Sequence, residues 1–187
     1  MPRTAPLIRQ ATPADAVELL ALWSATTRGT VTTDRAVAEA ELALANLAAN
    51  PDERLLVAEV DGDVVAAVAL KRGQVSPLVP DPVVHTSFLL VLPQFRRHGY
   101  AHALLEAAVS WAEEKDVDHI TAITDGNRDT NRFLARLGLV TLGTVRLTST
   151  ATLRKKLSAE RSRLSGNRHL VEVISHRRSV RRRQAGY

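Results

Sequence analysis

The chain has 187 residues, of which 45% are hydrophobic and 24% charged, a composition typical of a soluble globular protein with one sizeable core. It contains no cysteine, which excludes disulfides, thiolate nucleophiles and cysteine metal sites. No apolar run approaches the roughly 18 residues of a membrane span, and the first ten residues lack the apolar core of a signal peptide, so we expect a cytoplasmic protein.

Charge is distributed unevenly along the chain. The formal net charge is +5, but residues 154–187 contain eleven Lys or Arg and two Glu, so the rest of the chain is net negative. The sequence therefore predicts a globular domain over residues 1–157 and a basic C-terminal extension over residues 158–187, partly helical or disordered.

A short strand at Leu7–Gln10 and two helices are predicted in the first fifty residues. The first helix begins at Thr12-Pro13-Ala14-Asp15, which combines a capping Thr, a Pro in the first turn and an acid three residues after the cap. It runs to about Ala25, and its candidate buried residues are Val17, Leu20 and Trp23. Residues 26–33 form a polar loop. A second helix covers 34–49, with an inner face formed by Val37, Ala40, Leu44 and Leu47.

A β-hairpin follows the second helix. Residues 54–60 and 64–70 are rich in strand-forming side chains and are joined by Asp61-Gly62-Asp63, a short connection typical of antiparallel hairpins. Residues 73–82 contain three prolines, which predicts an irregular loop before the next strand.

The central stretch of the chain is a strand, a basic turn and a helix. Residues 83–91 suit a mostly buried strand, and Pro93 ends it because proline cannot donate a ladder hydrogen bond. From Leu104 onward, apolar residues recur at helical spacing, with the acidic residues on the opposite side. Gln94 to Ala101 connects the two, and this turn contains Arg96, Arg97 and Gly99.

The basic turn suits an anion. A helix N-terminus has unpaired N–H groups and a partial positive charge, and a glycine lets an anion approach the backbone closely. Arg96 and Arg97 add full charges beside those groups. From these residues alone, both a phosphate site and an ordinary solvated connection fit the turn.

Further elements follow to about residue 155. We expect a strand over 118–124, a turn at Asp125-Gly126, a helix over 127–137 ended by Gly138, and two last strands over 140–147 and 148–155. The element order is β-α-α-β-β-β-α-β-α-β-β. It predicts an α/β (α+β) fold with a mixed central sheet of about six to seven strands and helices on both faces.

Two motifs resemble those of the GCN5-related N-acetyltransferase (GNAT) superfamily. Arg96-x-x-Gly99-x-Ala101, preceded by Val91-x-Pro93, is similar to that family's acyl-CoA pyrophosphate loop. The stretch from Asn127 through Phe133 to Gly138 is similar to its later helix, and Leu153-x-Lys155-x-Leu157 resembles its closing strand. The resemblance covers about residues 7–157 and the same element order, so it implies the GNAT fold.

The resemblance implies acetyl-CoA as co-substrate and assigns residues to it. Backbone groups of the strand would hold the pantetheine arm and the thioester carbonyl, and those residues are Leu89, Leu90 and Val91. The turn would hold the pyrophosphate, through Arg96, Arg97, His98, Gly99, Tyr100 and Ala101. Asn127 would approach the pantetheine from the next helix. Transfer would be direct attack by an amine, since no Cys exists to form an acyl-enzyme.

The catalytic groups are less defined. The family often uses a Tyr as general acid, and the corresponding residue here is Leu134, so the acid is unknown; Tyr100 and Tyr187 are the two tyrosines. His85 is the candidate base, and a histidine satisfied by its neighbours is the structural alternative. Strand alternation predicts that His85 faces the same side as Ser87, Leu89 and Val91. Ser87 is a candidate to position a water, and Glu59 is a further candidate base. His98 and His102 lack zinc-ligand spacing, so no metal site is expected.

The basic tail has two interpretations. Residues 168–184 fit a short amphipathic helix whose charges include Arg177, Arg178, Arg181, Arg182 and Arg183. Such a cluster suits nucleic acid or a ribonucleoprotein, and a helix docked on the domain is the alternative.

Two functions therefore stay open: an N-acetyltransferase for an amine acceptor, on a small molecule or a protein, and a weakly active or inactive GNAT-fold module tethered through its tail. Either a monomer or a homodimer is compatible with the sequence.

Overall fold

The computed structural model describes residues 6–26, 33–78, 81–124, 126–143 and 145–161. Several predictions fall wholly or partly outside these ranges: the loops over 26–33 and 73–82, the turn at Asp125-Gly126, the strand over 140–147, the extension over 158–187, and the helix over 168–184 with its arginines Arg177, Arg178, Arg181, Arg182 and Arg183. Contacts divide the chain into two compact units, Met1–Thr141 and Leu142–Tyr187. The predicted domain boundary after Leu157 stays a prediction.

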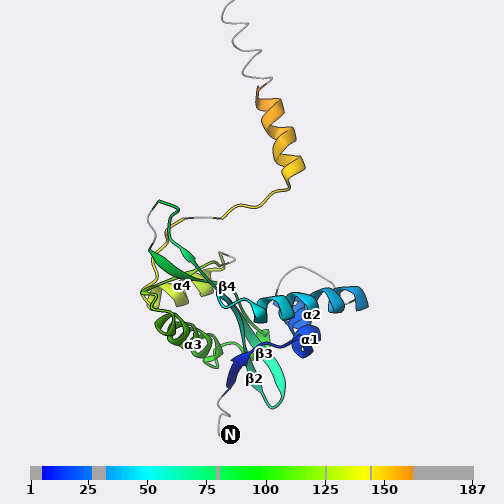
Figure 1. The fold of residues 1–187 in the computed structure, drawn as a ribbon, viewed down its shortest axis with the longest axis vertical. Coiled ribbons are helices and arrows are strands. Elements are labelled where there is room, and N and C mark those ends of the chain that lie inside the picture. Colours follow the sequence, from blue (N-terminus) through cyan, green and yellow to red (C-terminus); the bar gives the residue numbers. More distant parts are fainter. Residues whose placement is uncertain (1–5, 27–32, 79–80, 125, 144, 162–187) are drawn as a thin grey trace, which may run out of the picture. The chain divides into compact units, whose positions relative to one another are not determined.

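The first unit contains a mixed five-stranded sheet (Figure 1). Its strands are β1 (Leu7–Gln10), β2 (Glu53–Val60), β3 (Asp63–Gln74), β4 (Pro82–Val91) and β5 (His119–Ala122). They lie in the order β1-β2-β3-β4-β5, and every neighbouring pair is antiparallel except β4 and β5, which are parallel. The predicted mixed sheet is confirmed.

The hairpin of β2 and β3 forms as predicted. Asp61 and Gly62 both have positive φ, 53° and 93°, which is the backbone of a two-residue turn matched to strand twist. However, β3 continues to Gln74, so the expected loop starts later than Gly73. The reason is that Lys71 to Gln74 pair with the beginning of β4.

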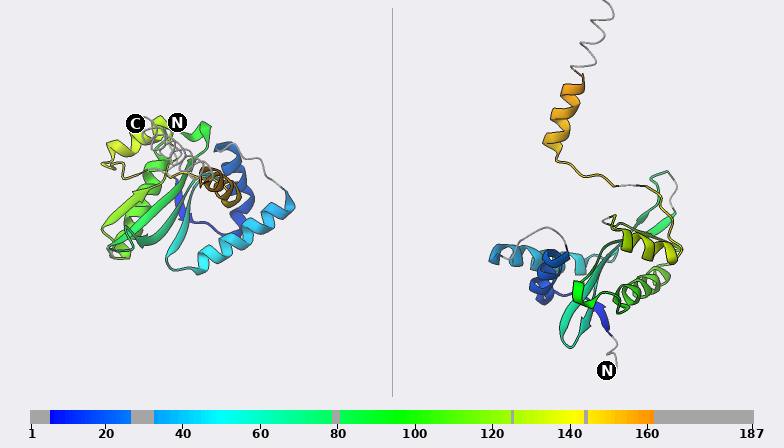
Figure 2. Two further views of the ribbon diagram at one scale, coloured as in Figure 1. Left: turned by 90° about the horizontal axis from the view of Figure 1, so that it is seen from above. Right: turned by 180° about the vertical axis from the view of Figure 1, so that it is seen from behind.

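Helices cover both faces of the sheet (Figures 1 and 2). A 3-10 turn at Pro13–Asp15 leads into α1 (Ala16–Thr26), and α2 (Asp34–Ala49) follows; both pack on one face with Val57, Val64 and Ala67. On the other face, α3 (Tyr100–Glu114) packs against the alternate strand residues, which include Leu56, Ala58, Val68, Leu70 and Val84. The inner face predicted for α2 is confirmed, since Leu44 is buried and Val37, Ala40 and Leu47 are partly buried.

The buried side of α1 differs from the prediction. Val17 is 52% and Trp23 39% exposed, whereas Ala16 and Leu22 are buried. The cause lies at the start of the helix, where Asp15 is drawn inward by Arg9. The inward side then follows Asp15, Leu19 and Leu22 at helical spacing, which turns Val17 and Trp23 outward.

An ion-pair cluster fixes that helix start to the sheet. The Arg9 guanidinium donates to both carboxylate oxygens of Asp15, at 2.8 and 2.7 Å, and to Glu59 Oε2 at 2.7 Å. The Thr12 backbone N–H also donates to Asp15, at 2.6 Å. The hydrogen bond from Arg9 lowers the pKa of Asp15 from 3.8 to about 2, against the opposing effect of burial. Glu59, the further candidate base, is therefore held by Arg9 and serves the fold.

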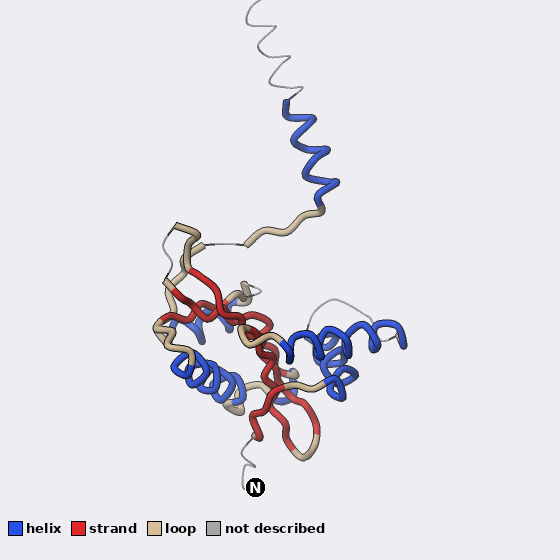
Figure 3. The backbone as a smooth tube through the Cα atoms, viewed as in Figure 1, coloured by secondary structure: helices blue, strands red, loops and turns tan. Residues whose placement is uncertain are grey.

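The last two predicted strands are wrong where the structure describes them. Residues 139–149 contain no strand in their described part, and residues 150–161 are helical (Figure 3). Ser149 caps this helix, since its hydroxyl accepts from the Thr152 backbone N–H at 3.2 Å. The helix is rich in Ala, Leu, Arg, Lys and Glu, whose high helix propensity favours a helix over the predicted strand. The described residues therefore hold five strands, not the six or seven predicted.

No helix among the described residues combines the length and the apolar character that crossing a membrane requires.

Candidate active site

The sheet opens between β4 and β5. The two strands pair only from Val83 to Thr86 and from His119 to Ala122, and the Ile123 N–H donates to the Thr86 carbonyl at 2.8 Å. β4 continues for five more residues, Ser87 to Val91, still paired with β3 on its other side. Within the described residues, this stretch of β4 therefore has no partner strand on the side of β5. Its outward backbone groups are available to a ligand that hydrogen-bonds like a strand.

A bulge in β4 lies at the point where the strands part. Ser87 pairs with Ala69 and Leu90 with Ala67, so Phe88 and Leu89 together face the single residue Val68. Phe88 has φ of 53°, in the left-handed region, which costs a bulky residue on the order of 1–3 kcal/mol. A strained backbone at a strand opening is typical of a functional site.

The bulge reverses the alternation of side chains along β4. Before it, Val84 packs with α3, so His85 and Ser87 face the side of α1 and α2. After it, Leu89 and Val91 pack with α3, whereas Leu90 packs with α1 and α2. The prediction that His85 and Ser87 share a face with Leu89 and Val91 is therefore wrong, because one extra residue moves later side chains to the opposite face.

The turn before α3 presents backbone N–H groups. Gly99 caps the helix with φ of 91°, and Arg97 also has a positive φ, 63°. In the part of the chain that the structure describes, the N–H groups of residues 97–101 have no hydrogen-bond partner. The side chains of Arg96 and Arg97 are exposed beside them. Unpaired donors, a helix N-terminus and two arginines together suit a phosphate group.

Two residues of this turn support its shape. The His98 Nδ1–H donates to the Arg96 carbonyl at 2.8 Å, and its ring stacks on Tyr100 with centroids 5.9 Å apart. Tyr100 is buried in the core formed with α3 and also contacts Phe95, at 6.1 Å. Tyr100 therefore anchors the turn in the core, and His98 stabilises the turn through its hydrogen bond to Arg96 and its stacking on Tyr100. Ala101 is half-buried, and its methyl side chain leaves space beside the first turn of the helix.

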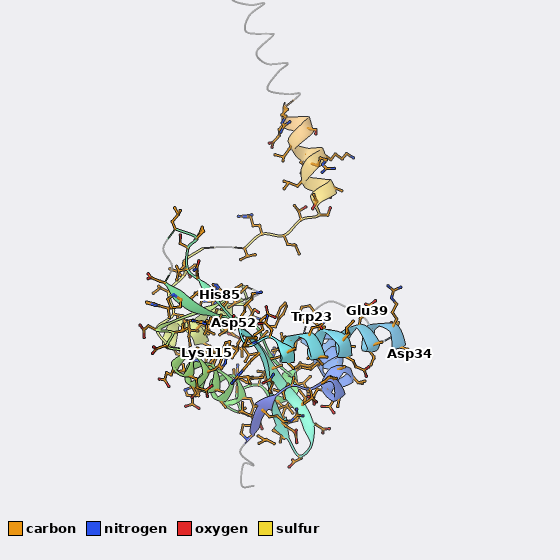
Figure 4. The ribbon with its side chains drawn as sticks, viewed as in Figure 1. Trp23, Asp34, Glu39, Asp52, His85 and Lys115 are labelled. Carbon is orange, nitrogen blue, oxygen red and sulfur yellow. The ribbon has the colours of Figure 1, made fainter. Side chains whose placement is uncertain are left out.

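His85 is held between two neighbouring strands (Figure 4). Its Nδ1 lies 2.8 Å from Oγ1 of Thr121 on β5. On the other side, a Cβ added to Gly73 of β3 would come within 2.9 Å of both Cδ2 and Nε2 of the ring. Gly73 therefore leaves the space that the imidazole fills. His85 lies in the paired part of β4, two residues before Ser87, where the gap begins.

The helix α4 (Arg128–Arg136) carries the second motif. Asn127 caps it, with Oδ1 accepting from the Asp129 N–H at 2.8 Å, and Gly138 ends it with φ of 89°, as expected. Leu134, at the family's acid position, is 5% exposed and apolar. It can donate no proton to a leaving group.

Sequence reasoning missed two arrangements. One is the placement of His85 between Gly73 and Thr121. The other is a contact between Trp23 of α1 and Phe88 at the bulge. The first depends on strand register across the sheet, and the second on the β4 bulge and on the packing of α1 against β4; neither leaves a signal within one segment alone.

The sequence profile of the Acetyltransferase (GNAT) family matches residues 17–139. Several solved structures have the same fold. A transcriptional regulator from Bacillus halodurans C-125 superposes with a TM-score of 0.70 at 17% identity, over 77% of this chain and 99% of the other. A putative acetyltransferase from Agrobacterium tumefaciens C58 gives 0.64 at 22% identity, over 77% and 99%.

An aminoglycoside N-acetyltransferase in complex with CoA gives a TM-score of 0.65 at 19% identity, over 80% of this chain and 98% of the other. At these identities the structures support the fold alone. The comparison with curated proteins gives no match.

Proposed function

Because the chain belongs to the acetyltransferase (GNAT) family, we propose that it is an N-acetyltransferase that moves the acetyl group of acetyl-CoA directly to an amine acceptor. One observation carries the proposal. The gap beside Ser87–Val91 is followed in the chain, after a 3-10 turn at Pro93–Phe95, by residues 97–101, whose backbone N–H groups are unpaired within the described residues. A strand-like ligand arm that ends in a pyrophosphate fits these two features together.

The residues present fit acetyl-CoA. The backbone N–H groups of Arg97 to Ala101 would hold the pyrophosphate, with the charges of Arg96 and Arg97 beside it. Leu89, Leu90 and Val91 would hold the pantetheine arm and the thioester carbonyl through their backbone. Each donor aimed at the carbonyl oxygen contributes roughly 3 kcal/mol of transition-state stabilisation. Asn127 would contact the arm from the cap of α4.

The reaction needs one proton acceptor. A neutral amine attacks the thioester carbon, a C–N bond forms, the C–S bond breaks, and CoA leaves as its thiolate. The amine loses a proton to a base, for which His85 is the candidate; Thr121 would accept from Nδ1–H and leave the Nε2 lone pair basic. Ser87 lies on the same face of β4 as His85 and would position a water between the amine and His85.

The leaving thiolate receives no proton from Leu134. A general acid contributes typically about 10²–10⁴-fold to rate, so we expect modest turnover.

The absence of an acid at Leu134 also supports a second proposal, a weakly active module tethered to a nucleic acid or ribonucleoprotein through basic residues. The helix at 150–161 has four Lys or Arg and one Glu. Under this proposal, RNA binding by the full chain would fall steeply with salt and acetyl transfer would be negligible.

Thiol release tests the main proposal cleanly. Because the chain has no cysteine, a thiol reagent would report free CoA without background from the protein. The full chain is mixed with acetyl-CoA and a panel of primary amines, and we expect release that depends on the amine. Absence of release with every amine, or release that ignores the amine, would contradict direct transfer.

A further inference from the structure

Two aromatic side chains meet where the gap begins. Trp23 in the last turns of α1 and Phe88 at the β4 bulge have ring centroids 5.0 Å apart, with planes inclined by 57°. They are 39% and 52% exposed. The whole chain has seven aromatic residues, and this pair from two distant segments remains partly in solvent. Adjoining exposed aromatic side chains form an apolar surface patch, and such patches are candidate ligand-binding surfaces.

The pair lies on the side from which an acceptor can reach the thioester. On the α3 side of the gap, Leu89 and Val91 pack into the core. On the α1 side, Leu90 packs but Ser87 and Phe88 remain at least partly exposed. Phe88 has a left-handed backbone at the bulge, and its ring contacts Trp23. An amine approaching the gap from this side therefore passes the two rings (Figure 4 labels Trp23).

The charges of the two elements that carry the pair narrow the acceptor class further. After Glu18, α1 has no acidic residue up to its end at Thr26. β4 also has no Asp or Glu. Recognition of a polycation needs carboxylates to pair its charges. These segments offer aromatic carbon instead.

We propose that Trp23 and Phe88 form the acceptor-binding wall and select primary amines that carry an aromatic or bulky apolar group. The inference rests on the proposed function and names its acceptor class. The acceptor ring packs edge-to-face against the pair, and its amine points into the gap. Polyamines and other polycations are poor ligands because they lose hydration without gaining carboxylate partners.

Calorimetric titration of the full chain saturated with CoA tests this without requiring turnover. The probes are 2-phenylethylamine, butylamine and spermidine. We expect 2-phenylethylamine to bind about tenfold more tightly than butylamine, with spermidine weakest. Trp23→Leu and Phe88→Leu each reduce that preference to about threefold or less, whereas Phe88→Tyr retains it. Leu42→Ala, at an exposed apolar residue of α2, is the matched control and leaves it unchanged.

The outcomes separate the two proposals. Equal binding of the aryl and alkyl amines, or a preference that survives both leucine variants, overturns the inference. Thiol release from many amines without aryl preference overturns it too, while acetyl transfer stands. Preferential aryl binding without any thiol release supports the aromatic wall and contradicts the acetyltransferase proposal. A CoA-induced rise in melting temperature, retained in each variant, shows that the variants are folded.

Discussion

The two sides of the proposed active site are built from different parts of the polypeptide. Around Gly99, the groups that face the ligand are backbone N–H groups at the start of α3. On the α1 side of β4, they are the side chains of His85, Ser87 and Phe88. The backbone side should tolerate side-chain changes and fail when its conformation is lost. The other side should respond to single side-chain changes that leave the fold intact.

The largest effect is expected for Gly99→Glu. The residue has φ of 91°, which disfavours any side chain, and the new carboxylate would lie among the phosphate-binding N–H groups. We expect acetyl-CoA affinity to fall by more than about 100-fold in calorimetric titration.

A matched control exists at Gly62 in the β2–β3 turn. It has nearly the same φ, 93°, and similar open space. Gly62→Glu should therefore cost about as much stability, on the order of 1 kcal/mol, and leave acetyl-CoA affinity unchanged. Equal loss of affinity in both variants would refute the assignment of the turn.

Replacement of the candidate base should affect turnover and spare cofactor binding. His85→Gln keeps a hydrogen-bonding partner for Thr121 but cannot accept a proton. We expect kcat/KM for the amine to fall about 100-fold, with the affinity for acetyl-CoA unchanged. The measurement is amine-dependent thiol release at saturating acetyl-CoA. An unaltered kcat/KM in the variant would identify His85 as a structural residue.

The Arg9 cluster offers a test outside both sides of the site. Asp15 has its pKa lowered from 3.8 to about 2, so it stabilises the fold above about pH 4, and this contribution is lost as pH falls through 2. The shift corresponds to about 2 kcal/mol. Asp15→Asn should lower the free energy of unfolding by about that amount at neutral pH. Denaturant unfolding at pH 7 and pH 2.5 measures this, and an equal difference from wild type at both would contradict it.

The smallest effect is expected for Gly73→Ala. The added Cβ would lie 2.9 Å from two atoms of the His85 ring, so the ring must shift. We expect about a tenfold loss of kcat/KM, measured by thiol release. In a His85→Ala background the same substitution should cost little, because the ring is gone. A full loss in that background would mean that Gly73 acts independently of His85.

This difference between the two sides also decides what the sequence could predict. The turn before α3 was predictable because proline ends β4, glycine takes a positive φ, and both have fixed local consequences. The same holds for Asp61-Gly62, for α2 with its apolar residues at helical spacing, and for Gly138 at the end of α4. These features depend on residues a few positions apart.

The side of the proposed site that consists of β4 side chains was not predictable, because it depends on how β4 pairs with its neighbouring strands. A single extra residue at Phe88 reverses which residues of β4 share a face, and nothing in the composition of β4 marks it. The placement of His85 between Gly73 and Thr121 involves three separate strands, β3, β4 and β5. Likewise, the inward turn of Asp15 toward Arg9 changed which residues of α1 are buried. At residues 150–161, high helix propensity and a Ser149 cap give a helix where we predicted a strand.

Thermal unfolding of the full chain with and without acetyl-CoA tests the central claim most directly, with the Gly99→Glu and Gly62→Glu variants in parallel. At about 100 times its Kd, a ligand adds roughly 2.7 kcal/mol to stability. We predict a clear rise in melting temperature for the wild type and Gly62→Glu, and none for Gly99→Glu. No rise in the wild type at millimolar acetyl-CoA, or an equal rise in Gly99→Glu, would contradict the proposed cofactor site.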